Sequence, residues 1–387
     1  MAEDVTREVM EVDVLIVGGG AAGLSAAIHL QKLVQERGLG ELMVAVIEKG
    51  SEVGAHSLSG AVLDPSALIE LIPDFREKGC PIEAVVDHDE VHFLTKRMNF
   101  KAPVTPPQFK NEGNFLVSAA KFNRWLGQQA EAMGVNVFAG FAAVEALYDE
   151  VGKVIGVRTG DKGVDKHGGP KANFEPGLLL HSKITIFAEG TRGSLFKQVA
   201  KKLDLFKGKN PDSYEEGVKE IIQCPPGTVK PGQVIHTAGW PLDKTIGGTF
   251  IYTLPGDQLI LGLVGYLDTH DPLFDPHRDL QRLKTHPFIA KMIKGGKVIA
   301  YGGKTLPAGG WFSMPKLYHD GMMVCGDSAM MVDVKRLKGI HMAMKSGMLA
   351  AETAAEALAK GDFSAAVLCG YEKRIEDSFI KTQLWAT

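Results

Sequence analysis

Residues 12–48 read VDVLIVGGGAAGLSAAIHLQKLVQERGLGELMVAVIE, and this stretch decides the fold of the chain. An apolar run over residues 12–17 predicts a buried strand, and the glycine-rich residues 18–23 predict a turn that leads into a helix. A second apolar run over residues 42–47 predicts another strand, which ends at Glu48. The order strand, glycine-rich turn, helix, strand and acid is typical of a dinucleotide-binding βαβ unit.

Each residue of this motif has a physical role in holding a pyrophosphate. We expect Gly18 to permit the tight turn, Gly20 to let the backbone approach the phosphates, and Gly23 to let the helix pack on the strand. The N–H groups and the partial positive charge of the helix N-terminus attract phosphate. Glu48 is placed to accept hydrogen bonds from ribose hydroxyls. A glycine-rich turn in an ordinary α/β domain would explain neither the three glycines together nor the acid.

The composition indicates a folded protein with two or more structural units. Its 387 residues carry 43 basic and 46 acidic side chains, and the net charge of −3 gives no reason to expect a nucleic-acid partner. The cysteines Cys80, Cys224, Cys325 and Cys369 lie far apart without a CxxC motif, so we expect no zinc or iron–sulfur site in this chain. No segment predicts a transmembrane helix, a secretion signal or a transit peptide.

The remaining sequence falls into two kinds. Apolar strands that end in glycine turns recur at residues 183–190 and 322–327, as in the first motif. Residues 205–310 instead contain short strands, many glycines and prolines, and a hairpin over residues 249–267, which together predict an antiparallel sheet inserted into the first domain. Residues 74–114 are expected to be irregular, because the prolines of KAPVTPPQF are incompatible with a helix or a central strand.

Three strand-end motifs therefore follow one another: GGGAAG at residues 18–23, FAEGTRGS at residues 187–194 and CGDS at residues 325–328. Their order resembles that of the FAD-dependent oxidoreductases of the glutathione-reductase and hydroxybenzoate-hydroxylase type. In that class the first motif holds the FAD pyrophosphate, the aspartate of the third motif binds the ribityl chain, and the helix that follows points at the flavin.

Longer strings sharpen the resemblance. HTAGWPLD at residues 236–243, IGGTFIYTL at residues 246–254 and LKGIHMAMKSGMLAAE at residues 337–352 are similar to those of the electron-transfer-flavoprotein:ubiquinone oxidoreductases. The similarity runs from residue 12 to residue 358. It implies an α/β fold with an FAD-binding Rossmann-like domain of the glutathione-reductase type and an inserted antiparallel quinone or substrate domain. The implied segments are 10–75, 115–204 and 318–362 for FAD, 76–114 and 205–317 for quinone, and a tail, 363–387, that leads to an absent iron–sulfur portion.

The resemblance implies a non-covalent FAD and a set of residues around it. These cofactor-binding residues are Gly18, Gly20, Ala22, Gly23, Glu48, Lys49, Gly54, Ser57, Ser59, Gly60, Gly190, Gly326, Asp327, Asp333, Gly339 and Ile340. Asp327 would accept hydrogen bonds from ribityl hydroxyls, the alternative being a helix N-cap. The family carries an asparagine where this chain has Asp333, and a carboxylate there would lower the flavin potential. Glu189 is interpreted as part of an FAD-edge turn rather than as a catalytic acid.

For several residues near the expected flavin position, the sequence allows two interpretations. The helix N-terminus at Gly339 would face the flavin N1–C2=O edge, and Lys335, Arg336 and Lys338 would add positive charge there or else lie on a solvated or lipid-facing surface. His341 is a weak candidate for a proton relay to quinone, and a structural histidine is the simpler interpretation.

The resemblance also implies a quinone site and a membrane surface. The quinone ring is expected at Gly247 and Gly248, which otherwise would form only a bulge or turn. Trp311, Phe312, Met314 and Leu317, with residues 101–109, are expected to form an apolar plateau that dips into one leaflet, or else to be ordinary core residues.

The implied function is transfer of electrons from reduced electron-transfer flavoprotein to ubiquinone or menaquinone. The protein would be peripheral, on the cytoplasmic face of a bacterial inner membrane or the matrix side of the mitochondrial inner membrane. The family's 4Fe–4S cluster has no ligands in this chain, so a separate ferredoxin-like subunit is the partner of one alternative. The other alternative is an isoprenoid reductase of the geranylgeranyl-reductase type.

Overall fold

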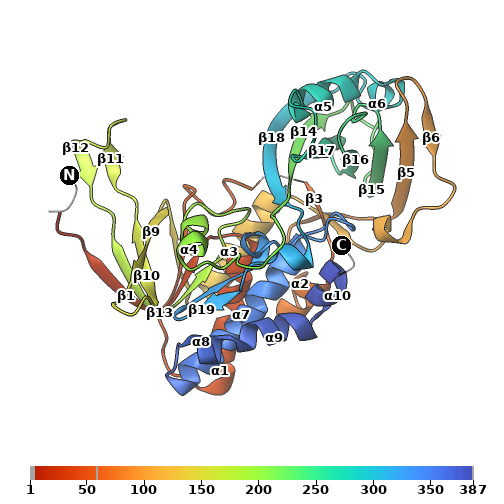
Figure 1. Cartoon of the computed structure of the whole chain (residues 1–387). Coiled ribbons are helices and arrows are strands. Elements are labelled where there is room, and N and C mark those ends of the chain that lie inside the picture. The colour runs from red at the N-terminus through yellow and green to blue at the C-terminus, as the bar shows by residue number, and fades with distance from the viewer. Residues whose placement is uncertain (1–4, 58–59, 386–387) are drawn as a thin grey trace.

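A mixed sheet built on the first glycine motif forms the base of the fold (Figure 1). In the computed structural model, which describes residues 5–57 and 60–385, the strand order is β19–β20–β13–β1–β2–β8, with β10 and β9 continuing from β13. The strands from β20 to β8 along this order run parallel. The bounds are β19 (Tyr318–His319), β20 (Met322–Val324), β13 (Leu179–Phe187), β1 (Val9–Val17), β2 (Val44–Glu48), β8 (Asn136–Ala139), β10 (Val154–Thr159) and β9 (Ala143–Tyr148).

Helices bury this sheet. Val14, Leu15 and Ile16 of β1 are fully buried, as expected for a parallel strand that is covered on both faces. The two long helices pack closely, because Gly347 allows its backbone to approach Ala22 of the first helix; a Cβ at residue 347 would lie 2.1 Å from the Ala22 carbonyl oxygen. The helices of this part are α1 (Ala21–Arg37), α2 (Ser66–Leu71), α3 (Ala119–Ala132), α4 (Phe196–Lys202), α7 (Ile340–Lys360), α8 (Ala365–Leu368), α9 (Gly370–Asp377) and α10 (Phe379–Trp385).

A second sheet of seven strands forms a separate lobe, at the upper right of Figure 1. Helices α5 and α6 cover one of its faces, where Leu261 and Leu263 pack with Leu280 and Leu283 in one apolar cluster. On the other face, Tyr252 and Ile260 form an apolar cluster with Val62 and Leu116, which lie outside this sheet. In sheet order the strands are β18 (Lys297–Pro307), β14 (Tyr214–Gln223), β17 (Gln258–Tyr266), β16 (Gly247–Leu254), β15 (Gln233–Gly239), β5 (His88–Leu94) and β6 (Asn99–Lys101), and the helices are α5 (Pro276–Lys284) and α6 (Pro287–Met292).

The expectation that residues 74–114 are irregular is wrong. Strand β5 pairs in parallel with β15 and in antiparallel with β6, and the prolines that suggested irregularity follow β6 instead of interrupting it. The smaller elements are β3 (Ala61–Leu63), β7 (Phe115–Val117) and β4 (Ile82–Val85) in one sheet, the hairpin β11 (Lys162–Val164) and β12 (Pro170–Glu175), and the 3-10 turns η1 (Pro107–Phe109), η2 (Trp311–Ser313) and η3 (Gly326–Ala329).

The predicted fold class is confirmed: an α/β domain of Rossmann type carries an inserted, mainly antiparallel sheet. The residue boundaries proposed for the two domains stay a prediction.

Candidate functional site

The three strand-end motifs meet at one edge of the first sheet. Val17 of β1 pairs with Phe187 of β13, and Phe187 pairs with Val324 of β20, so the three parallel strands end side by side. The turns that begin at Gly18 and Gly326, and the one that contains Gly190, therefore lie at the carboxyl end of the sheet. Ligands of open α/β sheets bind at this edge.

The surroundings of the first turn require glycine at two of the three predicted positions, Gly18 and Gly23. Gly18 has a φ of +117°, and a Cβ there would lie 2.3 Å from the Ala188 carbonyl oxygen. A Cβ at Gly23 would lie 2.1 Å from the Gly18 carbonyl oxygen, so only glycine lets α1 begin this close to the turn. A Cβ at Gly20 would meet no described atom within 4 Å, and no side chain of the described residues caps α1. The turn thus offers open backbone, which fits a pyrophosphate.

Glu48 lies at the end of β2 beside this turn. Its carboxylate accepts hydrogen bonds from the Gly19 N–H at 3.0 Å and from the Gly50 N–H at 2.7 Å. These bonds hold both carboxylate oxygens at the sheet edge while leaving lone pairs for ribose hydroxyls. Lys49, the next residue, is exposed.

Asp327 lies in η3, at the end of β20. Its carboxylate is 3.5 Å from the Thr191 hydroxyl, and burial raises its pKa, an effect that the Lys304 ammonium opposes. Cys325 occupies the N-cap position of η3, so the alternative role of Asp327 as an N-cap is wrong. A Cβ at Gly339 would lie 3.8 Å from an Asp327 carboxylate oxygen, which places the start of α7 beside this acid.

Two contacts fix the geometry of the middle and last turns. The Ser328 hydroxyl donates to the Gly190 carbonyl at 2.8 Å, and the Gly326 N–H donates to the Ser346 hydroxyl at 2.9 Å. The Glu189 carboxylate accepts the backbone N–H groups of the residues that lead into α4, at 2.7–3.0 Å. The Glu189 carboxylate therefore stabilises the turn, which agrees with the interpretation that Glu189 is not a catalytic acid.

The loop after β2 bridges the two lobes. A Cβ at Gly54 would lie 2.5 Å from the Ala120 carbonyl oxygen, and Ser57 accepts a hydrogen bond from Asn123 at 2.8 Å, so this part lies against α3. Gly60 instead reaches the second sheet, where its carbonyl accepts the Lys219 ammonium at 2.6 Å and a Cβ would collide with Ile260. Ser59 lies outside the described residues.

The segment before α7 is a tight, buried turn. Asp333 and Lys338 exchange backbone hydrogen bonds of 3.0 Å, and the Arg336 N–H donates to the Asp333 carboxylate at 2.9 Å. Arg336 also forms an ion pair of 3.1 Å with Asp64. Lys335 is exposed, whereas Lys338 is only 3% exposed, so the surface alternative is wrong for Lys338. Burial lowers the pKa of Lys338 to about 8.

His341 makes contacts that are typical of a structural histidine. Its Nε2 is hydrogen-bonded to Gln383 at 2.8 Å, and its ring stacks on Phe379. The side chain is fully buried, and burial lowers its pKa. These contacts connect α7 to α10.

Gly247 and Gly248 begin β16 on the second sheet. A Cβ at Gly247 would lie 2.2 Å from the Val264 carbonyl oxygen, so close pairing with β17 explains this glycine. Gly248 points to the opposite face, because successive residues of a strand alternate. Lys219 and Ile260, which contact Gly60, lie on the same face as Gly248, since Gly217 and Gly248 both pair with Val264.

The predicted apolar plateau is partly wrong. Met314 and Leu317 are buried in the main core, whereas Phe312 is 52% exposed. Trp311 and Phe312 both contact Trp385 of α10. The sequence of this segment does not reveal that packing, because the partner lies about 70 residues away.

Exposed apolar side chains also gather on the β5–β6 hairpin and just after it, in residues 101–109. Phe93, Met98, Phe100 and Val104 are each more than half exposed. Phe93 and Phe100 are paired directly across the two strands, so they share one face of the hairpin. Sequence reasoning missed Phe93, Met98 and Phe100, although the apolar residues that flank a lysine- and arginine-containing turn were a usable signal.

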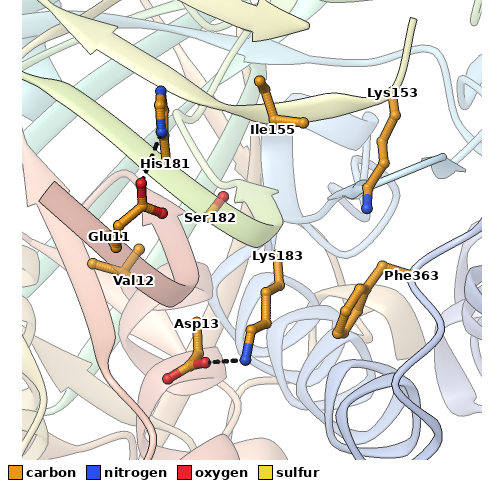
Figure 2. Close-up of a pocket in the computed structure, with 9 residues that line it drawn as sticks. All are labelled: Glu11, Val12, Asp13, Lys153, Ile155, His181, Ser182, Lys183 and Phe363. Carbon is orange, nitrogen blue, oxygen red and sulfur yellow. Dashed lines mark hydrogen bonds and ion pairs between the residues drawn. The ribbon is translucent and has the colours of Figure 1, made fainter. Parts of the chain in front are cut away.

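A separate pocket of about 470 Å³ lies away from this edge (Figure 2). Glu11 pairs with His181 at 2.9 Å, and Asp13 pairs with Lys183 at 2.6 Å, all on β1 and β13 upstream of the strand ends. The pocket is therefore far along the strands from the glycine turns, and each of its two acidic side chains is paired with a basic one.

Among residues 5–57 and 60–385, no group of three or more histidine, cysteine, aspartate or glutamate side chains is arranged to hold a metal ion. Within the same ranges, no helix has the length and apolar character needed to cross a membrane.

Comparison with known proteins agrees with this geometry. The model of the ETF-QO ubiquinone-binding family matches residues 214–306, the strands β14 to β18, and that of the NAD(P)-binding Rossmann-like domain matches residues 16–74. The electron transfer flavoprotein-ubiquinone oxidoreductase of Pseudomonas aeruginosa is 45% identical, over 98% of this chain and 70% of its own length. The chain belongs to the electron transfer flavoprotein-ubiquinone oxidoreductase family.

Other members of the family are similarly related. The human mitochondrial electron transfer flavoprotein-ubiquinone oxidoreductase is 44% identical over 97% of this chain and 61% of its own length. The chain spans about 60–70% of the length of the curated relatives that it matches. A solved geranylgeranyl bacteriochlorophyll reductase-like protein of Thermoplasma acidophilum has the same fold, with a TM-score of 0.74 and 20% identity over 97% of this chain and 86% of its own.

Proposed function

We propose that this chain is an FAD-dependent oxidoreductase that passes electrons from reduced electron transfer flavoprotein to ubiquinone or menaquinone. Family membership supports the activity. The arrangement of residues at the carboxyl edge of the first sheet supports the binding of FAD. There, the open glycine turn after β1, Glu48 at the end of the neighbouring β2, and Asp327 after β20, which β13 separates from β1, lie along one edge of the sheet. When bound, FAD supplies the electron-transfer chemistry.

The residues of the site would hold non-covalent FAD from one end to the other. The N–H groups of Ala22 and Gly23 face the pyrophosphate, Glu48 holds the adenosine ribose, and Asp327 holds the ribityl hydroxyls. The start of α7 has no acidic residue in its first turn and no side-chain cap among the described residues. Its N–H groups can therefore stabilise negative charge on the reduced ring. The positive charge of Lys338 adds to this stabilisation of the reduced ring, and the negative charge of the Asp333 carboxylate reduces it.

The quinone ring would lie against Gly248, on the face of the second sheet directed at the Gly60 loop. This placement rests on the strand register, which puts Gly248, Lys219 and Ile260 on one face. The match of residues 214–306 to a ubiquinone-binding family supports it. A quinone with an isoprenoid tail must come from a bilayer, so the exposed apolar β5–β6 hairpin would dip into one leaflet as a peripheral anchor, on the cytoplasmic or matrix side.

The isoprenoid-reductase alternative is not favoured. The relatives at 44–45% identity over nearly the whole chain carry the quinone-reductase name, whereas the geranylgeranyl reductase-like structure is only 20% identical and shares the fold.

The test is anaerobic mixing of the FAD-loaded chain with reduced electron transfer flavoprotein and a short-chain ubiquinone, with quinol formation as the readout. Quinol that forms only when the chain is present supports the proposal. If quinone does not reoxidise chemically reduced enzyme, the proposal fails. If quinone does, but electron transfer flavoprotein cannot reduce the flavin, electrons enter through a further 4Fe–4S unit, and co-purification of a ferredoxin-like subunit identifies it.

A further inference from the structure

A buried carboxylic acid and a phenol form a pair on the second sheet. Glu215 of β14 lies directly opposite Tyr266 of β17, so the two side chains share one face of the sheet and lie within reach of each other. Glu215 is only 6% exposed although it is an acid near the beginning of its strand. Burial without a compensating cation is expensive for a carboxylate, so this position favours the protonated acid.

The strand register places this pair beside the proposed quinone position. Directly opposed residues of antiparallel strands share a face, and residues two apart on one strand do so too. Gly217 and Gly248 both pair with Val264. Glu215 is two residues from Gly217 and Tyr266 is two residues from Val264, so the pair and Gly248 lie on the same face. Tyr266 is thus the diagonal neighbour of Gly248 across β16 and β17.

The surroundings leave Glu215 able to exchange a proton near neutral pH. Its other cross-strand neighbour, on β18, is the apolar Leu306. The cations on this face, Lys304 and Lys219, are displaced along the strands, and the nearby charge that acts on Tyr266 is the acid Asp268. Burial raises the pKa of Glu215 to about 7, and it raises the pKa of Tyr266 to about 12.

We propose that Glu215 supplies a proton, through the Tyr266 hydroxyl, to a carbonyl oxygen of the quinone at Gly248. This inference rests on the proposed function.

The step balances when reduced flavin is the reductant. Reduced FAD, when bound, would supply the two electrons and would release two protons to solvent. The Tyr266 O–H bond breaks as an O–H bond forms on one quinone oxygen, and Tyr266 takes the Glu215 proton in turn. The second oxygen takes a proton from water, and the Glu215 carboxylate is reprotonated from solvent. One dihydroflavin and one quinone therefore give one flavin and one quinol.

Three variants of the FAD-loaded chain test this role. Glu215→Gln removes the exchangeable proton, Tyr266→Phe removes the hydroxyl but keeps the ring, and Glu216→Gln makes the same change on the opposite face of β14 as a matched control. We expect Glu215→Gln and Tyr266→Phe to lower kcat for quinol formation by about tenfold or more, within the usual contribution of a general acid. Glu216→Gln should stay within twofold of the unchanged chain.

The pH profile separates proton supply from a structural effect. In the unchanged chain, kcat should fall as the pH rises through about 7, because the donor loses its proton. In Glu215→Gln this fall should be absent. Infrared spectra of the same FAD-loaded proteins supply a readout apart from activity: a protonated-carboxyl band should titrate near neutral pH in the unchanged chain and in Glu216→Gln, and disappear in Glu215→Gln.

The outcomes are distinct from those of the functional test. If the unchanged chain does not reduce quinone, the proposed function and this inference both fail. If it does, and Glu215→Gln matches Glu216→Gln in rate and pH profile, this inference alone is wrong. Should Glu215→Gln fail to fold, Tyr266→Phe decides, and an unchanged rate in that variant overturns the proposal.

Discussion

At the scale of single residues, two buried ionisable side chains, Lys338 and Glu215, lower the free energy of unfolding when they are charged. Lys338 and Glu215 are 3% and 6% exposed, and each sits where one protonation state is strongly disfavoured. Burial moves the pKa of the lysine down and that of the acid up, toward neutrality in both cases. Both groups therefore reduce stability near neutral pH, which is expected of residues retained for a function.

Lys338→Met should stabilise the chain and lower the flavin potential. The pKa of Lys338 is about 8 in the folded chain and near 10.5 when unfolded, so the penalty is full below pH 8 and vanishes as the pH rises to 10.5. We expect a gain of up to about 3 kcal/mol at pH 7 from removal of the ammonium. Thermal denaturation without FAD and potentiometric titration with FAD check the two effects, and Lys335→Met, an exposed neighbour, should change neither.

Glu215→Gln should remove a pH dependence of stability. The folded pKa of about 7 lies above the unfolded value of 4.5, so the unfolded chain gives up this proton first. The stability of the unchanged chain should therefore decline between pH 4.5 and 7, by up to about 3 kcal/mol from this group, and stay low above pH 7. Denaturant titrations of both proteins at pH 5 and pH 8 measure the difference. An equal loss in both would show that Glu215 is not the group responsible.

At the scale of elements, different glycines of the first turn are needed for folding and for FAD binding. Gly23 is needed so that α1 can begin beside β1, whereas Gly20 faces open space. Both residues belong to the same motif, and the sequence alone does not distinguish their roles. Their different surroundings make a sharp comparison.

Gly20→Ala should leave the fold intact and weaken FAD binding. The added methyl group meets no described atom, so the melting temperature without FAD should change little, while the affinity for FAD falls at least about tenfold because the backbone can no longer approach the phosphates. Gly23→Ala should lower the melting temperature itself, because its Cβ would lie 2.1 Å from the Gly18 carbonyl oxygen. Fluorescence titration with FAD and thermal denaturation distinguish the two. Equal FAD affinity in Gly20→Ala and the unchanged chain would contradict the proposed pyrophosphate position.

Elements whose partners are close in sequence are the ones that the sequence predicts well. The βαβ unit follows from residues 12–48 alone, and the hairpin of β16 and β17 follows from its turn. Strand β5 was not predicted, because its partner β15 lies about 140 residues away. The burial of Lys338 likewise was not predictable, because lysine is almost always exposed and nothing in its own segment signals that it is buried.

At the scale of the whole molecule, the exposed β5–β6 hairpin lies at the outer edge of the second lobe (Figure 1). An anchor at this edge would hold the face that carries Gly248 close to the bilayer, from which a quinone has to enter. The lobe that carries the FAD edge would then stay in water.

Replacing Phe93 and Phe100 together by serine should reduce binding to phosphatidylcholine vesicles by about fivefold or more, since each exposed ring contributes apolar area to the membrane. Vesicle co-sedimentation gives the partition, and the rate with a water-soluble quinone should stay unchanged. Val151→Ser, at the exposed turn between β9 and β10, is the control for loss of a surface apolar group. Equal partition of the hairpin variant and this control would rule out the hairpin as the anchor.

The long sequence separation of β5 and β15 also determines when the two strands can pair during synthesis of the chain. Strand β5 leaves the ribosome about 140 residues before its neighbour, a delay on the order of 10 s at ordinary elongation rates. During this interval the aromatic hairpin has no sheet to join, and its open edge is available to other chains. A nascent chain halted before residue 233 would carry a complete first glycine motif and an unfinished second lobe. The sheet of the second lobe can therefore close only after β18 has been made, and the first sheet, which needs β20, closes later still.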